Sequence, residues 1–437
     1  MQLDRTIYNA DNLLVMSRMP GECVDLIYLD PPFNSGKQWE NPLKETGKKV
    51  SFKDTWTLAD IHEDDHEILQ GRCPAAAAVI ETLGYANGGS WQAYLTYMGM
   101  RLVQMHRLLK PTGSIYYHCD PTMSHGVKLM MDCIFGKKNF RNEIVWAYTG
   151  PGSPKMRQFN RKHDIVFWYS KGDEWTFNQD DVRVPYKDGK PHTGGFKSSM
   201  DNSLADNYGK KGKIPETWWS DIALAIRGKE NTGYPTQKPI ALLRRILKAS
   251  SNPGDLVLDP FCGCGVTAAA SELFFDDRRR WIGIDVGTEA KAALLDKLNR
   301  KGYHLFAGSL PSIDMVVGSD LPDLPPIPKR KEVMEILHKG QGGKCRCCEK
   351  SLTGQHPEID HLRPRAKGGD NHLSNLHLLC RECHKKKGTK TMTDTRRRVI
   401  AENAAASMEK WRKESAAALV KEKAKAIAKA EKQKRMI

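Results

Sequence analysis

The sequence predicts an α/β fold in which a doubly wound, largely parallel sheet is followed by a small metal-bound module and a basic helical tail. Two short, mainly apolar runs, 24–27 and 256–258, have the length and composition of buried parallel strands. Helical and strand-like stretches also alternate between residues 91 and 146. An aspartate, Asp30 or Asp259, closely follows each apolar run. Because open α/β sheets bind ligands at the carboxyl ends of their strands, both acids are expected at the binding edge.

The stretch Asp30-Pro31-Pro32-Phe33-Asn34 combines an acid, a stiff turn and an aromatic ring. The two prolines remove backbone donors and leave carbonyls that can only accept hydrogen bonds. Asp30 and the Pro31 carbonyl can therefore accept the two N–H hydrogens of an exocyclic amine, while Phe33 stacks on the ring that carries it. Taken alone, a strand end followed by a Pro-Pro turn is the simpler interpretation.

A second stretch, residues 256–267, reads as a buried strand, a tight glycine turn and the start of an Ala-rich helix. Its glycines allow the backbone to approach a ligand closely. Twenty residues past Gly265, the strand-like run 281–285 ends in Asp285. This is the spacing at which a carboxylate binds ribose hydroxyls in nucleotide-binding βαβ units. Together with the acid-Pro-Pro-Phe turn, the pattern is strong evidence for a nucleotide-like ligand.

Residues 1–310 resemble the beta-class DNA amino-methyltransferases that use S-adenosyl-L-methionine, in which the target-amine motif comes before the methyl-donor motif. Residues 234–239 (Tyr-Pro-Thr-Gln-Lys-Pro) resemble the segment that leads into the donor pocket of this family. The resemblance implies a Rossmann-like sheet with an inserted target-recognition region at about 150–230. The catalytic residues it implies are Asp30, Pro31, Pro32 and Phe33. The cofactor-binding residues it implies are Asp259, Pro260, Phe261, Gly263, Gly265, Thr267, Asp285 and Lys238. A turn that begins with Asp rather than Ser favours N6 of adenine over N4 of cytosine in this family.

Prolines between 311 and 328 indicate a semi-rigid linker and therefore a domain boundary. Before it, residues 35–90 are expected to be irregular. The predicted organisation is a methyltransferase domain at 1–310, a linker at 311–330, a zinc module at 331–390 and a basic helical tail at 391–437.

Five of the eleven cysteines fall between Cys345 and Cys383. Cys345-x-x-Cys348 and Cys380-x-x-Cys383 have the ligand spacing of a structural zinc site. Cys347 is an extra thiol inside the first pair, so the first ligand pair stays ambiguous.

Residues 340–390 also resemble the HNH nuclease module, through Asp360-His361, Asn375 and His384. The resemblance implies that His361 activates water as the general base. Asp360 and His384 would hold a divalent cation such as Mg²⁺, and Asn375 would fix the loop that orients His361. A zinc ribbon that binds DNA without cutting it is the alternative. No role is expected for His356, His372 or His377.

The basic charge lies almost wholly in the C-terminal quarter. From residue 326 onwards the chain has 28 Lys and Arg against 13 Asp and Glu, a net charge of +15, whereas the first 325 residues have a net charge of +1. This asymmetry predicts a polyanionic partner bound in a salt-dependent way. The resemblances imply that this partner is double-stranded DNA. A solvated charged helix is an alternative for the tail. The sequence has neither an 18-residue apolar run nor a signal-peptide pattern, which predicts a soluble, intracellular protein without membrane contact. With the resemblances above, we expect a cytoplasmic, nucleoid-associated protein of bacterial or phage type.

The predicted function is site-specific DNA methylation at an exocyclic amine, N6 of adenine, by a chain that also carries a metal-dependent HNH endonuclease, as in restriction-modification systems. Methylation of N4 of cytosine, methylation of RNA, and a zinc module that only binds DNA are the alternatives. A homodimer is left open.

Overall fold

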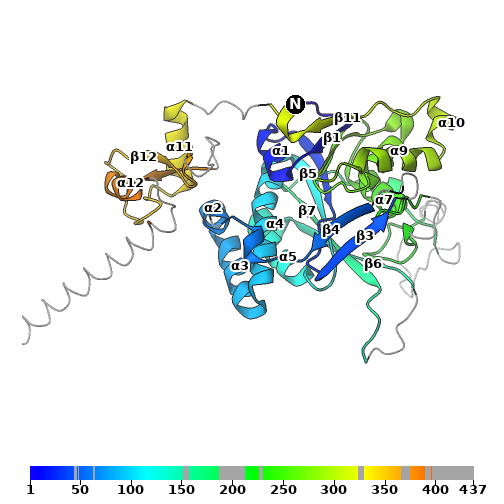
Figure 1. The fold of residues 1–437 in the computed structure, drawn as a ribbon, viewed down its shortest axis with the longest axis horizontal. Helices are drawn as coiled ribbons and strands as arrows, with labels where there is room; N and C mark the ends of the chain where they lie inside the picture. The colour runs from blue at the N-terminus through cyan, green and yellow to red at the C-terminus, as the bar shows by residue number, and fades with distance from the viewer. Residues whose placement is uncertain are drawn as a thin grey trace, which may run out of the picture. The chain divides into compact units, whose positions relative to one another are not determined.

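The computed structural model describes residues 1–43, 47, 49–62, 64–150, 157–186, 212–225, 230–322, 329–365, 375–388 and 395. The chain forms two compact units, Met1–Pro325 and Pro326–Ile437 (Figure 1). Within the described ranges, none of the helices combines the length and the hydropathy needed to span a bilayer.

The described part of the first unit is organised around a nine-stranded sheet, which confirms the predicted α/β class. Its strands are β1 (Thr6–Asn9), β2 (Val24–Leu29), β5 (Leu109–Cys119), β6 (Phe140–Ala147), β7 (His163–Ser170), β8 (Trp218–Trp219), β9 (Leu256–Asp259), β10 (Arg280–Asp285) and β11 (Asp314–Val317). Their order across the sheet is β11-β1-β10-β9-β2-β5-β7-β6-β8. The strands from β11 to β5 run parallel, and β7 runs antiparallel to β5 and β6.

The strand order reverses between β2 and β9, which are neighbours in the centre of the sheet. Leu26 pairs with Val257 and Ile27 with Leu258, while the chain continues from β2 towards β5 and from β9 towards β10. Such a reversal is the topological switch point at which open α/β sheets form their ligand crevice. The aspartates that follow the two strands therefore come to the same crevice.

Helices pack around this sheet, with α2 to α5 on one side of the unit and α7, α9 and α10 on the other (Figure 1). They are α1 (Asn12–Arg18), α2 (Asp65–Arg72), α3 (Pro74–Asn87), α4 (Gly89–Leu108), α5 (Ser124–Met131), α7 (Ile240–Ser250), α8 (Val266–Glu272), α9 (Ala290–Arg300) and α10 (Tyr303–Ala307).

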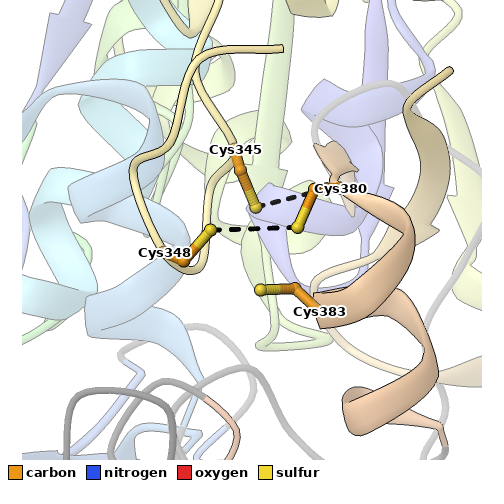
Figure 2. Close-up of side chains that lie close together, drawn as sticks. All are labelled: Cys345, Cys348, Cys380 and Cys383. Atoms are coloured by element: carbon orange, nitrogen blue, oxygen red, sulfur yellow. Dashed lines mark hydrogen bonds between the residues drawn. The ribbon is translucent and has the colours of Figure 1, made fainter. Parts of the chain in front are cut away.

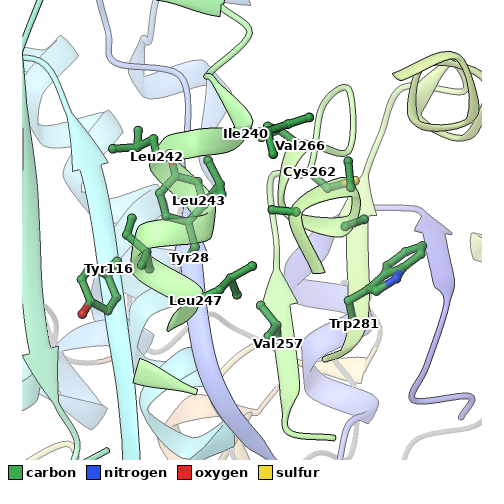
Figure 3. Close-up of a cluster of buried hydrophobic side chains, with 14 of the residues drawn as sticks. Tyr28, Tyr116, Ile240, Leu242, Leu243, Leu247, Val257, Cys262, Val266 and Trp281 are labelled. Atoms are coloured by element: carbon green, nitrogen blue, oxygen red, sulfur yellow. The ribbon is translucent and has the colours of Figure 1, made fainter. Parts of the chain in front are cut away.

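Helix α7 has the apolar face that its sequence predicts. Leu242, Leu243, Ile246 and Leu247 are fully buried in the main core cluster. Figure 3 shows side chains of α7 pointing towards the strands that carry Tyr28, Tyr116 and Val257. Burial of each aliphatic side chain stabilises the unit by roughly 1.5–3 kcal/mol, so α7 fixes the segment that precedes it over the end of the sheet.

Residues 35–90 are not irregular, contrary to the prediction. They form an antiparallel hairpin of β3 (Lys37–Pro42) and β4 (Lys49–Asp54), followed by α2 and α3. The hairpin was missed because β3 is almost wholly exposed and lacks the alternation of a half-buried strand. In α3, Pro74 occupies the first turn, where its missing N–H has no cost.

Two domain limits also differ from the sequence-based expectation. Strand β11 lies inside the predicted linker, 311–330, and pairs with β1 in register from Thr6–Asp314 to Asn9–Val317. Strand β7 lies inside the predicted target-recognition region, 150–230, yet it is an inner strand of the sheet. The sheet therefore extends past residue 310, and it includes β7 and β8 from the region between 150 and 230.

The second unit has the predicted ββα arrangement. It contains α11 (Arg330–Gly340), an antiparallel pair of β12 (Glu358–His361) and β13 (Leu376–Leu379), and α12 (Arg381–Lys387). Its small core includes the buried side chains of Val333, Leu362, Leu378 and Leu379. Apart from Thr395, the predicted helical tail at 391–437 lies outside the described residues.

Candidate active site and metal centre

A cavity of about 1250 Å³ lies at the switch point of the sheet. Most residues predicted for the target and donor motifs line it together: Asp30, Pro31, Pro32, Phe33, Asp259, Pro260, Phe261, Gly263, Asp285 and Lys238. The two that do not, Gly265 and Thr267, lie at the start of α8, immediately behind the glycine turn. The fold thus joins two motifs that are far apart in the sequence.

Asp30 forms an ion pair with Lys238 at the edge of this cavity. The Lys238 Nζ donates to both carboxylate oxygens, at 2.9 Å and 2.7 Å, and the lysine side chain is only 7% exposed. A longer bond, 3.4 Å, joins the same Nζ to the carbonyl oxygen of Thr236. Lys238 was predicted to bind the cofactor, but its contacts are with the target motif rather than the glycine turn.

Phe33 stacks on the ring of His118, with centroids 5.9 Å apart and an interplanar angle of 22°. His118 is fully buried, with Nδ1 2.9 Å from the Tyr28 hydroxyl and Nε2 3.0 Å from an Asp164 oxygen. Burial alone would raise the pKa of Asp164, but hydrogen bonding and charge from His118 lower it below the usual value. His118, held by Tyr28 and Asp164, therefore supports the ring of Phe33. The sequence did not predict this contact, because the position of His118 at the end of a strand was the one indication of a role.

Asp54, at the end of β4, holds the turn that follows the target motif. Its buried carboxylate accepts the Asn34 N–H at 2.7 Å and also binds the Ser35 hydroxyl, while its carbonyl accepts the Gly36 N–H at 2.9 Å. Asn34 has a left-handed backbone, φ 61°, which asparagine tolerates well. The β3–β4 hairpin is thereby tied to the wall of the cavity.

The glycine turn after β9 is held by Asp259, whose carboxylate accepts the Thr267 hydroxyl at 2.5 Å and the Phe261 N–H at 3.1 Å. Gly263 and Gly265 both have positive φ, 47° and 69°. A Cβ on Gly265 would lie 2.9 Å from the Cβ of Leu294, so this position requires glycine.

Asp285, at the end of β10, closes the other side of the turn. Its carboxylate accepts the Gly263 N–H at 2.8 Å and the Gly287 N–H at 2.7 Å. Burial raises the pKa of Asp285 above its ordinary value and raises the pKa of Asp259 to about 7. A cationic ligand would stabilise both carboxylates in their charged form.

The cavity carries many acids: Asp11, Asp30, Asp54, Asp120, Asp164, Asp259 and Asp285. This excess of carboxylates suits a ligand with positive charges, as the sulfonium and ammonium groups of S-adenosyl-L-methionine are. Gly263 and Gly265 carry no side chain, so at these positions such a ligand could lie against the backbone. The residues present therefore fit the predicted donor.

In the second unit, the four cysteines predicted as zinc ligands come together (Figure 2). The sulfur atoms of Cys345, Cys348, Cys380 and Cys383 all lie within 4.8 Å of one another, and those of Cys348 and Cys380 are 3.8 Å apart. A tetrahedral zinc with Zn–S bonds of about 2.3 Å sets its sulfurs about 3.8 Å apart, so the set fits zinc. Cys347 is outside this group, which resolves the ambiguity of the first pair.

Asn375 closes the loop that follows the Asp360-His361 pair. Its side-chain oxygen accepts the Arg363 N–H at 2.8 Å, and its amide donates to the Arg363 carbonyl at 3.0 Å. These two bonds fit the predicted role of Asn375 in fixing the loop next to His361.

Asp360 lies in a buried polar cluster that the sequence did not indicate. Its Oδ2 is 3.1 Å from the Nζ of Lys387 and 3.8 Å from the Nε2 of His377, its register partner on β13. Burial opposes the charged form, yet His377 and Lys387 together hold the pKa of Asp360 well below its usual range. His377, given no role from the sequence, thus contacts a predicted metal ligand. The pairing of Asp360 with His384 around a cation stays a prediction.

Comparison with known proteins adds two family matches. A family model described as DNA methylase matches residues 24–296, and one described as HNH endonuclease matches residues 345–400. The chain is 29% identical over 288 residues to the DNA adenine methyltransferase YhdJ of Escherichia coli (strain K12), covering 65% of this chain and 79% of that protein. It is 27% identical over 337 residues to the type II methyltransferase M.EcaI of Enterobacter cloacae, covering 63% and 65% of the two chains. Among solved structures, the cytosine-N4-specific PvuII DNA methyltransferase matches with a TM-score of 0.42 and 16% identity, over 72% of this chain and 98% of that one.

Proposed function

The chain belongs to the DNA methylase family and carries an HNH endonuclease domain, and from this premise we propose that it methylates N6 of adenine in double-stranded DNA. The observation that carries the proposal is the shared cavity, in which the acid-Pro-Pro-Phe turn after β2 lies beside the glycine turn after β9. The adenine specificity named for the relative YhdJ supports the choice of base. Cytosine N4 is the alternative target.

The donor, S-adenosyl-L-methionine, supplies an electrophilic methyl group. Asp259, Gly263 and Asp285 would hold it, since they line the cavity together at the glycine turn. Asp30 and the Pro31 carbonyl would accept the two N–H hydrogens of the target amine and so orient its nitrogen lone pair. The nitrogen–carbon bond forms as the carbon–sulfur bond breaks, the electron pair goes to sulfur, and the nitrogen then loses a proton to solvent. No cysteine nucleophile takes part.

The target base must leave the DNA duplex to reach Asp30, which costs a few kcal/mol of stacking and pairing. Stacking on Phe33 would offset roughly 1–3 kcal/mol, by analogy with proteins that bind single strands. The network of His118, Tyr28 and Asp164 beneath Phe33 supports this role, because a stacking platform must itself be rigid.

For the second unit we propose metal-dependent DNA cleavage. His361 would take a proton from water, and Asp360 and His384 would hold a divalent cation that neutralises the developing phosphate charge. The four-cysteine cluster would bind a structural zinc, which a segment with so small a core needs. The alternative is a unit that only binds DNA.

Plasmid incubation with Mg²⁺ tests this part of the proposal. Nicking or linearisation by the wild-type chain that is lost in His361→Ala supports cleavage. Intact plasmid in every condition favours the alternative, and retained mobility shifts would show that DNA binding persists.

The remaining parts of the proposal concern partners. Segments flanking β7 between 150 and 230 would read the target sequence, and the basic tail at 391–437 would lie on DNA in the cytoplasmic nucleoid. The chain would act as a monomer or a homodimer, which sedimentation on duplex DNA distinguishes.

Methyl transfer is tested with radiolabelled donor offered to duplex DNA and to RNA, followed by nucleoside analysis. Label in N6-methyladenine of DNA supports the proposal. Label in N4-methylcytosine selects the other base, and label in RNA alone contradicts the proposal.

A further inference from the structure

The ammonium of Lys238 touches both groups that the target base is expected to contact. Its Nζ lies 2.9 Å and 2.7 Å from the two oxygens of Asp30 and 5.1 Å from the ring centroid of Phe33. Both side chains of the ion pair are largely shielded, with 7% of Lys238 and 19% of Asp30 exposed. The pair lies at the cavity that also holds the glycine turn, and its carboxylate is the one expected to contact the target amine.

Lys238 reaches this position from a segment that the fold holds rigidly. It stands two residues before α7, whose apolar face is fully buried in the core, and Lys238 itself is buried. Gln237, its neighbour, accepts the backbone N–H and hydroxyl of Thr232 at 3.1 Å and 2.8 Å and donates to the Glu230 carbonyl at 2.8 Å. The lysine is therefore anchored before any ligand arrives.

Asp30 lies near other carboxylates, and the positively charged Lys238 offsets their repulsion. Asp30 raises the pKa of Asp259 by its charge, and the positive charge of Lys238 contributes to the lowered pKa of Asp164. Lys238 thus interacts with two carboxylates of an acid-rich cavity, those of Asp30 and Asp164. Without it, Asp30 would face other negative charges with no counter-charge in contact.

We propose that Lys238 is a positioning residue for the target amine, which rests on the proposed methyltransferase function. The two-oxygen contact fixes the plane of the Asp30 carboxylate. A carboxylate has about four lone-pair sites, of which Lys238 uses two, so Asp30 can still accept an N–H from the base without losing the lysine.

This assignment differs from a role in donor binding, and the two make opposite predictions for one pair of variants. Lys238→Met keeps the length of the side chain and removes its charge. Lys238→Arg keeps the charge and offers a planar fork that matches a carboxylate. Titration calorimetry with S-adenosyl-L-methionine alone measures donor affinity, and single-turnover methylation of duplex DNA measures the transfer step.

In Lys238→Met we expect the donor Kd to stay within about twofold and the single-turnover rate to fall about 100-fold, the scale of loss when a reacting group is misplaced by about 1 Å. Lys238→Arg should recover most of that rate. Recovery by the charged variant separates positioning from a loss of packing, which arginine would not repair. If Lys238→Met does not fold, as judged by its thermal transition, Lys238→Gln takes its place.

Two results would overturn the inference. A donor Kd that rises about tenfold or more in Lys238→Met would assign the lysine to the donor site. A Met variant that methylates DNA at the wild-type rate would show that the ion pair has no part in transfer. A wild-type chain that labels no nucleic acid is a different failure, since it removes the proposed function itself and with it the role proposed for Lys238.

Discussion

Ile27 of β2 and Leu258 of β9 are register partners on neighbouring parallel strands, although most of the first unit separates them in the sequence. Because of this pairing, the acid-Pro-Pro-Phe turn and the glycine turn leave the sheet side by side. An amine held at Asp30 and a donor held at the glycine turn would then share one cavity. The chemistry proposed for the chain depends on this strand pairing more than on any single side chain.

Gly265→Ala should abolish donor binding and destabilise the first unit. The new Cβ would meet Leu294 at 2.9 Å, at a φ of 69° that costs alanine about 1–3 kcal/mol by itself. Gly254→Ala is the matched control, because Gly254 also has positive φ, 79°, but nothing within 4 Å of its Cβ position. Donor titration and thermal unfolding measure both effects. Equal donor affinity in the two variants would contradict a role for close packing in the turn.

Asp164→Asn should make the stability of the first unit less sensitive to acid. Because its pKa is lowered in the folded state, chiefly by His118 against the effect of burial, Asp164 contributes stability above its unfolded pKa of about 3.9. That contribution is lost as the pH falls through the lower, folded pKa. The Tm difference between wild type and variant should therefore be largest near neutral pH and shrink below about pH 4. A constant difference across this range would contradict the proposed linkage.

Cys383→Ser should remove zinc and unfold the second unit, since a site with three thiolates binds zinc more weakly and this unit has a small core. Zinc content of the purified chain and protection of residues 329–388 from proteolysis measure the loss. Cys347→Ser is the control, because Cys347 lies outside the four-cysteine group. One zinc per chain is expected for that control. Loss of zinc in Cys347→Ser alone would mean that the first ligand pair has been misassigned.

The local features of the site could be predicted because they depend on residues close together in the sequence. Short, mainly apolar runs predicted β2 and β9, and the two Cys-x-x-Cys spacings predicted the four-cysteine group, which the structure contains. The sequence predicted a tight glycine turn after residue 258, and Gly265 has the left-handed backbone, φ 69°, that such a turn allows.

Features that depend on partners far apart in the sequence could not be predicted in this way. Nothing near Lys238 indicates that its ammonium reaches Asp30, and nothing near His377 indicates that it faces Asp360. The edge strand β11 has only four residues, too few for a periodicity, and its pairing with β1 decides its structure. In each case the local sequence allows several arrangements, and contacts with residues far away in the sequence decide which one forms.

The central claim is tested most directly by single-turnover transfer of a radiolabelled methyl group to duplex DNA by the wild-type chain and by Asp30→Asn, with donor affinity measured on both. We expect the wild type to label adenine, and Asp30→Asn to bind the donor within about twofold while transferring at least about 100-fold more slowly, a typical loss for a group that contacts the reacting atoms. A wild type that leaves DNA unlabelled, or an Asn variant that labels it as fast, would contradict the account.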